Sequence, residues 1–221
     1  MIVTAVIPAR NEAKRIRPVV EHTLSFVDHV VVVDDGSSDG TMVAVQNMAD
    51  PKVHCLRHEV NLGKGAALKT GCDAAVLLKS DVIVCLDADG QHNPASIPLF
   101  LRTLADQQVD VVFGMRQFNN KMPLTMLVGN RLLSQFIHWL FRVMVHDTQS
   151  GFRAFTTVAY QKLRWHSSGY EAETEMIIRT GEYKLKYAEV DIDTIYYDNY
   201  KGTTALDGLR IFFHILRWKF I

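Results

Sequence analysis

The sequence has little cysteine, no excess charge of either sign and no long apolar run. Its three cysteines are an odd number without CxxC spacing, which argues against a disulfide framework and favours reduced, buried thiols. The formal net charge is +0, without the basic excess typical of nucleic-acid-binding proteins. No stretch reaches the roughly 18 uncharged apolar residues that indicate a membrane span, and the N-terminus lacks a basic signal-peptide region. We therefore expect a soluble or peripheral cytoplasmic protein without a nucleic-acid partner.

Hydrophobic residues make up 48% of the 221 residues, enough to bury one sizeable core. In the first half, short β-branched runs alternate with helical patterns, which predicts parallel strands joined by right-handed crossovers. The predicted strands are 2–7, 27–33, 53–56, 82–86 and 109–115, and the predicted helices are 13–25, 41–48, 65–78 and 94–107. We expect an α/β fold with a mostly parallel sheet and helices on both faces. Ligands of such sheets bind beyond the carboxyl ends of the strands.

The second half differs, because long apolar helical patterns dominate it. The predicted elements are a helix over 123–145 interrupted near Gly129, a short strand within 147–155, a helix over 171–179, a strand over 187–197, a polar loop over 198–204 and a last helix over 205–221. No repeat, low-complexity tract or linker separates the halves, so we expect one domain over 1–221.

Two carboxylates, Asp87 and Asp89, follow a predicted buried strand. Facing a diphosphate alone they would repel it, but Mg²⁺ and Mn²⁺ are typically held by one or two carboxylates together with substrate phosphates. A bound cation would neutralise a departing diphosphate. The pair therefore predicts a divalent-metal site, with Gln91 or His92 as a further ligand. The alternatives are an acidic turn without a ligand and, for His92, a polar residue at a helix entry.

A second polar cluster follows the second predicted strand. Asp34 lies at the strand end, where an acid accepts hydrogen bonds from a ribose or a base edge, whereas Asp39 or Thr41 suits helix capping. The segment 61–67 superficially resembles a phosphate loop but fits neither GxGxxG nor GxxxxGK[ST]. We interpret its glycines and alanines as close packing of a helix on the sheet, and we keep Lys64 as a candidate phosphate contact.

Six motifs occur in a fixed order: PARNE at 8–12, DDGSSDGT at 34–41, NLGKGAALKTG at 61–71, DADGQH at 87–92, GMR at 114–116 and DTQSGFR at 147–153. This order resembles family 2 glycosyltransferases of the GT-A fold. The resemblance is greatest to the branch of dolichol-phosphate mannosyltransferases and polyprenyl-phosphate glycosyltransferases, and it covers nearly the whole chain.

The resemblance implies roles for the matching positions. The nucleotide-sugar pocket would include Pro8, Arg10, Glu12, Val32, Asp34 and the candidate Lys64, with Arg10 in place of a tyrosine common in the mannosyltransferases. The diphosphate and its Mg²⁺ or Mn²⁺ would lie on Asp87, Ala88 and Asp89, with Gln91 nearby. The catalytic set would be Asp89, Arg116 on a phosphate, Asp147 near the reacting centre and Lys201 closing over the diphosphate.

The acceptor is predicted from charge. A sugar hydroxyl requires a general base, whereas a lipid phosphate is already an anion and needs cationic positioning. The candidates for its contacts are Arg116, Arg131, Ser150, Arg153 and Lys201. Arg153 also suits a structural pairing with a strand-end acid. Arg131 lies in an apolar stretch, where an unpaired buried charge is costly, and a position near lipid headgroups would remove that cost.

Two apolar stretches, 124–145 and 206–221, carry scattered basic residues. This composition is typical of helices that lie in a membrane interface, and the alternatives are core helices or an oligomer interface. Without a predicted span, the protein would bind the inner face of the cell membrane peripherally, rely on a small membrane-protein partner or use a soluble acceptor.

We therefore predict an inverting, metal-dependent hexosyltransferase. It would move mannose or glucose from a donor of the GDP-mannose or UDP-glucose type to a polyprenyl phosphate, with 1–116 binding the donor and 117–221 facing acceptor and membrane. The alternative is a family 2 enzyme that acts on a soluble glycan or protein. A sugar nucleotidyltransferase would place a Gly-rich phosphate loop where this chain has PARNE, and a non-catalytic module would be expected to have lost Asp87, Asp89 or Arg116.

Overall fold

A seven-stranded sheet forms the centre of the computed structural model, which describes residues 1–116, 124–193 and 214–219. The strands are β1 (Val3–Ala9), β2 (His29–Asp35), β3 (Val53–His58), β4 (Val82–Cys85), β5 (Val111–Arg116), β6 (Arg153–Thr156) and β7 (Tyr187–Ile192). Their order is β3-β2-β1-β4-β6-β5-β7, and all neighbouring pairs are parallel except the two that β6 makes with β4 and β5. The predicted mostly parallel sheet is confirmed.

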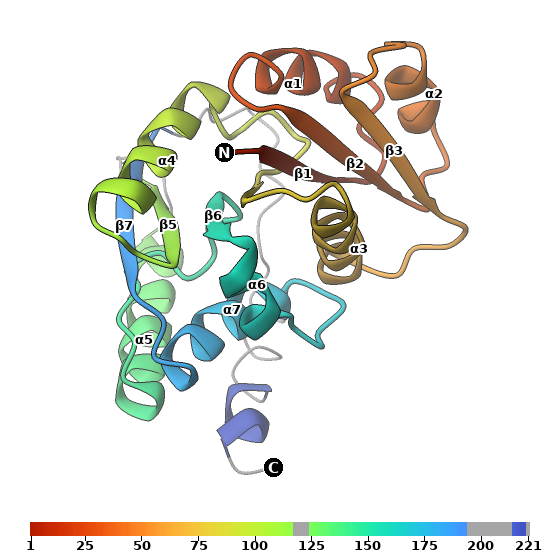
Figure 1. Ribbon diagram of the computed structural model, residues 1–221. Helices are drawn as coiled ribbons and strands as arrows, with labels where there is room; N and C mark the ends of the chain where they lie inside the picture. The colour runs from red at the N-terminus through yellow and green to blue at the C-terminus, as the bar shows by residue number, and fades with distance from the viewer. Residues whose placement is uncertain (117–123, 194–213, 220–221) are drawn as a thin grey trace.

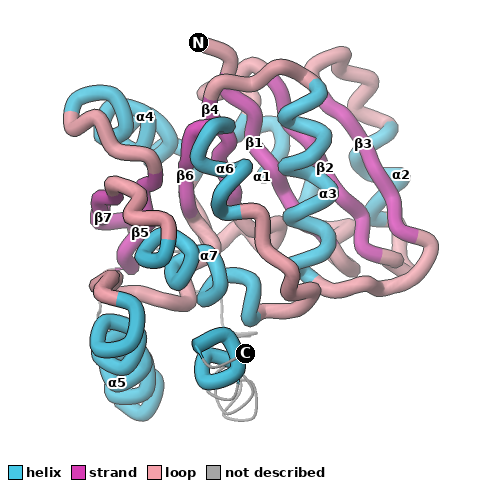
Figure 2. Tube along the Cα trace, turned by 60° about the horizontal axis from the view of Figure 1, so that its bottom comes forward, coloured by secondary structure: helices cyan, strands magenta, loops and turns pink. Residues whose placement is uncertain are grey.

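Helices cover both faces of this sheet (Figures 1 and 2). They are α1 (Ile16–Thr23), α2 (Thr41–Gln46), α3 (Lys64–Leu77), α4 (Ile97–Asp106) after a 3-10 turn over Pro94–Ser96, α5 (Leu124–Phe141), α6 (Thr157–Leu163) and α7 (Glu171–Glu182). Residues 214–219 are also helical. One apolar cluster joins the sheet to α3, α5, α6 and α7, and the other joins it to α1, α2 and α4.

The strands are apolar on both sides because each side of the sheet packs into one of these two clusters. In β2, Val31 and Val33 face the α3 cluster, whereas Val30 and Val32 face the α1 cluster. Successive side chains of a strand point to opposite faces, so a strand buried on both sides reads as a continuous apolar run. Such runs made β1, β2 and β4 predictable from the sequence.

Helix α3 lies close against β1 and β2 because it carries a glycine where it crosses them. A Cβ placed on Gly71 would overlap Cγ1 of Val6 and would lie 3.1 Å from Cγ2 of Val33. The predicted close packing of this small-residue helix on the sheet is confirmed. It brings the first residue of α3, Lys64, to the carboxyl ends of the strands.

Three features of the second half differ from the prediction. Strand β6 is antiparallel and lies between β4 and β5, α6 is a helix that the sequence pattern did not indicate, and α5 continues through Gly129 without a break. A Cβ on Gly129 would meet nothing within 4 Å among the described atoms, so this glycine does not mark a turn. The end of the predicted 187–197 strand and most of the predicted 205–221 helix lie outside the described residues.

Candidate active site

A cleft of about 460 Å³ opens at the carboxyl ends of β1, β4 and β5, where the sheet order changes direction. It is lined by these residues from the sequence prediction: Pro8, Arg10, Glu12, Lys64, Asp87, Ala88, Asp89, Gln91, His92 and Arg116. They come from the turn after β1, the start of α3 and the ends of β4 and β5. The fold thus brings together side chains that are separated by up to about a hundred positions in the chain.

An ion-paired triad forms one wall of the cleft. The ammonium of Lys64 lies 2.6 Å from Oδ1 of Asp87 and 2.7 Å from Oε1 of Glu173 on α7. Burial alone would raise the pKa of Asp87, but the Lys64 ammonium and then His92 outweigh burial, so the pKa is lowered. For Lys64 burial acts to lower the pKa, and the charges of Asp87 and Glu173 reverse the shift and raise it. Lys64 and Asp87 are therefore both charged in the folded protein near neutral pH.

Whereas the pKa of Asp87 is lowered, the pKa of the second carboxylate, Asp89, is raised. Burial raises its pKa, and the negative charge of Asp87 raises it further, while the backbone N–H of Gln91 donates to Oδ1 at 3.0 Å and acts against the shift. Negative charge on Asp89 is therefore incompletely balanced by the protein, a condition that a divalent cation would relieve. Two carboxylates with substrate phosphates suit Mg²⁺ or Mn²⁺, so the residues present fit the predicted metal.

A larger protein-only metal site is not present in the part of the chain that the structure describes, where no group of three or more His, Cys, Asp or Glu side chains is arranged around one point. His92 is 5% exposed, its Nδ1 accepts the backbone N–H of Asp87 at 3.1 Å, and its ring packs on Phe152. This ring therefore supports the loop between Asp87 and Asp89. Among the described residues, Asp87 and Asp89 remain the candidate ligands for a cation, with Gln91 as a neighbouring candidate.

Gly151 brings the backbone of the DTQSGFR motif against the acidic pair. A Cβ on this residue would lie 2.8 and 2.9 Å from the two carboxylate oxygens of Asp87 and 3.0 Å from Nζ of Lys64. Contacts below 3.0 Å force a shift, so a side chain here would displace the ion pair. The glycine is thus explained by a close approach to Asp87.

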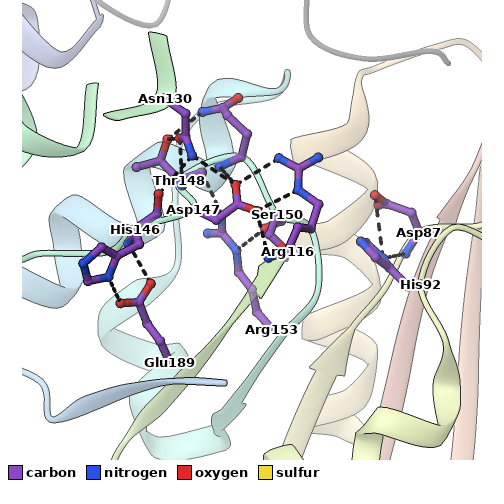
Figure 3. A network of polar contacts seen from close by, with 11 residues as sticks. Asp87, His92, Arg116, Asn130, His146, Asp147, Thr148, Ser150, Arg153 and Glu189 are labelled. Carbon is purple, nitrogen blue, oxygen red and sulfur yellow. Dashed lines mark hydrogen bonds and ion pairs between the residues drawn. The ribbon is translucent and has the colours of Figure 1, made fainter. Parts of the chain in front are cut away.

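Arg116 at the end of β5 is oriented by Asp147 (Figure 3). The guanidinium donates from Nε to Oδ2 at 2.7 Å and from Nη2 to Oδ1 at 2.9 Å, and the backbone N–H of Arg116 also donates to Oδ2 at 3.2 Å. Such a bidentate pair fixes both direction and distance. Asp147 is 1% exposed and does not line the cleft, whereas Arg116 does. Asp147 therefore lies behind Arg116 and contacts this arginine, not the cleft where the resemblance implied it would lie.

At the end of β2 the cleft is lined by Asp35 and not by Asp34, the acid that was predicted to line it. Asp34 is 1% exposed and absent from the cleft lining; Oδ1 accepts the backbone N–H of Ser37 at 3.0 Å, and Oδ2 lies 3.6 Å from Nε of Arg57. Asp35 lines the cleft instead and accepts hydrogen bonds from the backbone of Leu62 and Gly63, each at 2.8 Å. Its carboxylate thus fixes the loop before α3, and Asp34 has no described contact with the cleft.

Other predicted site residues lie away from the cleft. Val32 is a core residue 1% exposed, and Arg131 is exposed on α5. Arg153 is 1% exposed, because its guanidinium donates to the carbonyls of Ser150, Thr148 and Glu173. Burial lowers the pKa of Arg153, and the neighbouring acids act against this shift. These contacts support a structural role for Arg153, made through backbone carbonyls and not through the predicted pairing with a strand-end acid.

Two further positions complete the placement. Ser150 is 2% exposed and does not line the cleft, and its Oγ has no hydrogen-bond partner among the described residues. Lys201 lies outside the described residues, so its predicted closure over a diphosphate stays a prediction. Of the described residues that were predicted to contact an acceptor phosphate, Arg116 alone lines the cleft.

The sequence prediction missed several cleft residues: Asp35, Asn61, Gln149, Tyr170 and Glu173. Glu173 carried a usable signal. It stands three and four positions before Met176 and Ile177 on the predicted helix, so the helical period puts a carboxylate on an apolar side. Acids almost never occupy such positions unless they are paired, and Lys64 is the partner.

Known proteins resemble this chain over most of its length. The family model described as glycosyl transferase family 2 matches residues 4–163. A UDP-N-acetylglucosamine–dolichyl-phosphate N-acetylglucosaminyltransferase of Methanococcus voltae is 35% identical over 99% of this chain and 96% of its own length. A polyprenol monophosphomannose synthase of Mycolicibacterium smegmatis is 28% identical over 96% of this chain and 85% of its own.

Solved structures show the same fold. Glucosyl-3-phosphoglycerate synthase from Mycobacterium tuberculosis, in complex with Mn²⁺, UDP-glucose and phosphoglyceric acid, superposes with a TM-score of 0.75 at 20% identity and covers 98% of this chain and 79% of its own. Mannosyl-3-phosphoglycerate synthase from Rubrobacter xylanophilus gives 0.73 at 17% identity, over 99% and 74%. These likenesses concern the fold alone, which is the predicted GT-A fold. The family model and the Methanococcus relative show that the chain belongs to glycosyltransferase family 2.

Proposed function

We propose that the protein transfers a hexose-type sugar from a nucleoside-diphosphate sugar to a polyprenyl phosphate. The observation that carries this proposal is the alignment, over 99% of the chain, with a relative named for transfer to dolichyl phosphate. The cleft supports it, because it combines the acidic pair Asp87 and Asp89 with an oriented arginine, Arg116. The sugar is mannose, glucose or, as in the name of that relative, N-acetylglucosamine.

In this proposal Asp87 and Asp89 hold Mg²⁺ or Mn²⁺ together with the donor diphosphate, with Gln91 beside them. When bound, the cation offsets the negative charge that develops on the leaving diphosphate. Lys64 keeps Asp87 ionised and in place, since its ammonium is 2.6 Å from that carboxylate. The Mn²⁺ and UDP-glucose complex of the Mycobacterium tuberculosis synthase supports the use of a cation in this fold.

The proposed step is an in-line displacement with inversion. An oxygen of the acceptor phosphate attacks the anomeric carbon, the bond from that carbon to the diphosphate oxygen breaks, and the nucleoside diphosphate leaves. The acceptor is already ionised, so the step depends on positioning and not on a general base. Arg116 supplies this positioning in our proposal, because Asp147 fixes the direction of its guanidinium at the cleft.

We place the membrane contact on α5 and the 214–219 helix. These two segments lie side by side, since Nζ of Lys219 donates to the carbonyl of Leu140 at 3.0 Å. Leu132 and Trp139 are two turns apart on one side of α5 and are 60% and 76% exposed. No described helix is long and apolar enough to cross a bilayer. An exposed leucine and tryptophan on one side of a helix suit attachment to the cytoplasmic membrane surface, and a small membrane protein would be a further anchor.

A substrate panel tests the proposed function. The purified protein is incubated with Mn²⁺ and a short-chain polyprenyl phosphate, and with UDP-N-acetylglucosamine, UDP-glucose or GDP-mannose in turn. We expect one donor to give a glycosylated lipid phosphate, with loss of product when the cation is chelated. Parallel reactions contain a soluble glycan or phosphoglycerate as acceptor. Turnover with these acceptors and none with the lipid phosphate would replace our proposal by the soluble-acceptor alternative.

The membrane contact predicts the effect of one substitution. Trp139→Ser removes a large exposed aromatic side chain from α5 and should lower the fraction of protein that co-sediments with anionic lipid vesicles by several-fold, because aromatic burial contributes about 2 kcal/mol or more. Leu77→Ser is the matched control, since Leu77 is 83% exposed on α3, and should leave the bound fraction unchanged. Equal losses in both variants would contradict the assignment of α5.

A further inference from the structure

Asn130 is a side chain of α5 that reaches the segment carrying Asp147 (Figure 3). Its amide oxygen accepts the backbone N–H of Thr148 at 3.1 Å and the Thr148 hydroxyl at 2.7 Å. Its amide nitrogen donates to the carbonyl of His146 at 2.9 Å and lies 3.5 Å from Oδ1 of Asp147. One side chain therefore contacts three consecutive residues and fixes the position of this segment relative to the helix.

The same segment holds the guanidinium of Arg116. Both oxygens of Asp147 are used, because Oδ2 accepts from Nε and the backbone N–H of Arg116, and Oδ1 accepts from Nη2 and from the backbone N–H of Gln149 at 3.3 Å. The carboxylate is buried, so a rotation would leave charge without hydrogen bonds. A displacement of this segment must therefore displace the Arg116 guanidinium at the cleft.

We propose that Asn130 is a positioning residue for sugar transfer, which couples α5 to Arg116 through Asp147. This proposal rests on the proposed function, in which Arg116 positions a phosphate. The chain of contacts is continuous: Asn130 is bonded to the 146–148 segment, Asp147 to Arg116, and Arg116 lines the cleft. Because α5 exposes Leu132 and Trp139 on its surface, contact of this helix with the surroundings of the acceptor would reach the same arginine.

Kinetic measurements test this role. Asn130→Ala should lower kcat by about 10- to 100-fold with little change in the KM of the donor, since a misplacement of about 1 Å costs on the order of 100-fold. Asn130→Asp keeps the oxygen that faces Thr148 but adds negative charge beside Asp147, so we expect a loss at least as large. Ser134→Ala is the control on the same helix. Its hydroxyl bonds to the carbonyl of Val145 without touching Asp147, and kcat should stay within about twofold of wild type.

A double-mutant cycle separates positioning from a general loosening of α5. If Asn130 acts through Asp147, adding Asn130→Ala to Asp147→Asn should lower kcat little further. Because Asp147→Asn breaks a buried ion pair, a second cycle pairs Asn130→Ala with Thr148→Val, which leaves that ion pair intact. Penalties that multiply in both cycles, or an equal loss of kcat in Ser134→Ala, would overturn the proposal.

The same variants give a readout that needs no substrate. In urea unfolding, the Asn130→Ala, Thr148→Val double variant should show a smaller decrease in the midpoint urea concentration than the sum of the decreases in the two single variants. If wild type glycosylates no lipid phosphate, the proposed function fails, and the unfolding cycle still tests the link. If the decreases in the midpoint are additive, Asn130 and Thr148 are not coupled, and the link between α5 and this segment is contradicted as well.

Discussion

Asp89→Asn should abolish glycosyl transfer, with a loss on the order of 1,000-fold, and should leave the protein folded with an equal or higher melting temperature. The loss follows because the neutral amide no longer supplies charge for a divalent cation at the diphosphate. The gain in stability follows from the raised pKa of Asp89. An acid whose pKa is raised on folding favours the unfolded state once the pH is above both pKa values, so removal of its charge at neutral pH relieves a penalty. Initial rates with saturating Mn²⁺ and a thermal melt of the same preparation measure both effects.

The control for this substitution is Asp50→Asn. Asp89 accepts the backbone N–H two residues on, from Gln91, and Asp50 makes the same turn contact with the N–H of Lys52 at 2.8 Å, away from the cleft. Both amides can still accept this backbone hydrogen bond, so the control separates the loss of the turn contact from the loss of a carboxylate at the cleft. A metal-dependent rate in Asp89→Asn that is similar to Asp50→Asn would contradict our assignment.

Arg116→Lys should lower kcat/KM by about 100-fold or more although the charge is retained. A lysine ammonium cannot reproduce the two separated N–H donors that bind Asp147, and Arg-to-Lys exchange at a bidentate site is not conservative. The ammonium would lie at the wrong position for a phosphate, and Asp147 would lose a buried partner. We expect the loss in steady-state kinetics with both donor and acceptor varied.

Arg164→Lys provides a matched control for this exchange. Arg164 makes a similar fork with Asp73, from Nε at 3.0 Å and from Nη2 at 2.8 Å, but this pair lies at the protein surface. Exposed ion pairs contribute little to stability, so kcat/KM should remain within about twofold of wild type. If Arg116→Lys is as active as Arg164→Lys, the geometry of the Arg116 fork is not required for transfer.

Strands β1, β2 and β4 were predictable because each is a largely apolar run followed by a polar turn. The position of β6 was not. A short strand was predicted within 147–155 and β6, Arg153–Thr156, overlaps it, but nothing in these four residues indicates which strands they pair with. Its antiparallel direction depends on a connection through α5 and the DTQSGFR segment. The path of this connection is determined by tertiary packing, which no local sequence pattern reveals.

The candidate site was predictable where polar residues follow a strand directly, as at Asp87, Asp89 and Arg116. Prediction was incomplete where burial decides which of two adjacent residues lines the cleft. Asp34 and Asp35 are adjacent acids, and which of them lines the cleft depends on the alternation of β2 relative to α3. The pairing of Lys64 with Glu173 joins residues 109 positions apart, so it requires the packing of α3 against α7.

The insertion of β6 between β4 and β5 has a consequence for folding on the ribosome. Both neighbours of β5 in the described sheet, β6 and β7, come from later parts of the chain. Val111–Arg116 therefore emerges without a pairing partner and, at about 5–20 residues per second, waits for seconds until β6 is synthesised. Until then one edge of β4 is open to aggregation, and Arg116 has no Asp147 to orient it. A nascent chain halted after residue 116 would carry the acidic pair but not the arginine fork, so the Arg116 guanidinium would be held in its orientation at the cleft only once the sheet had closed.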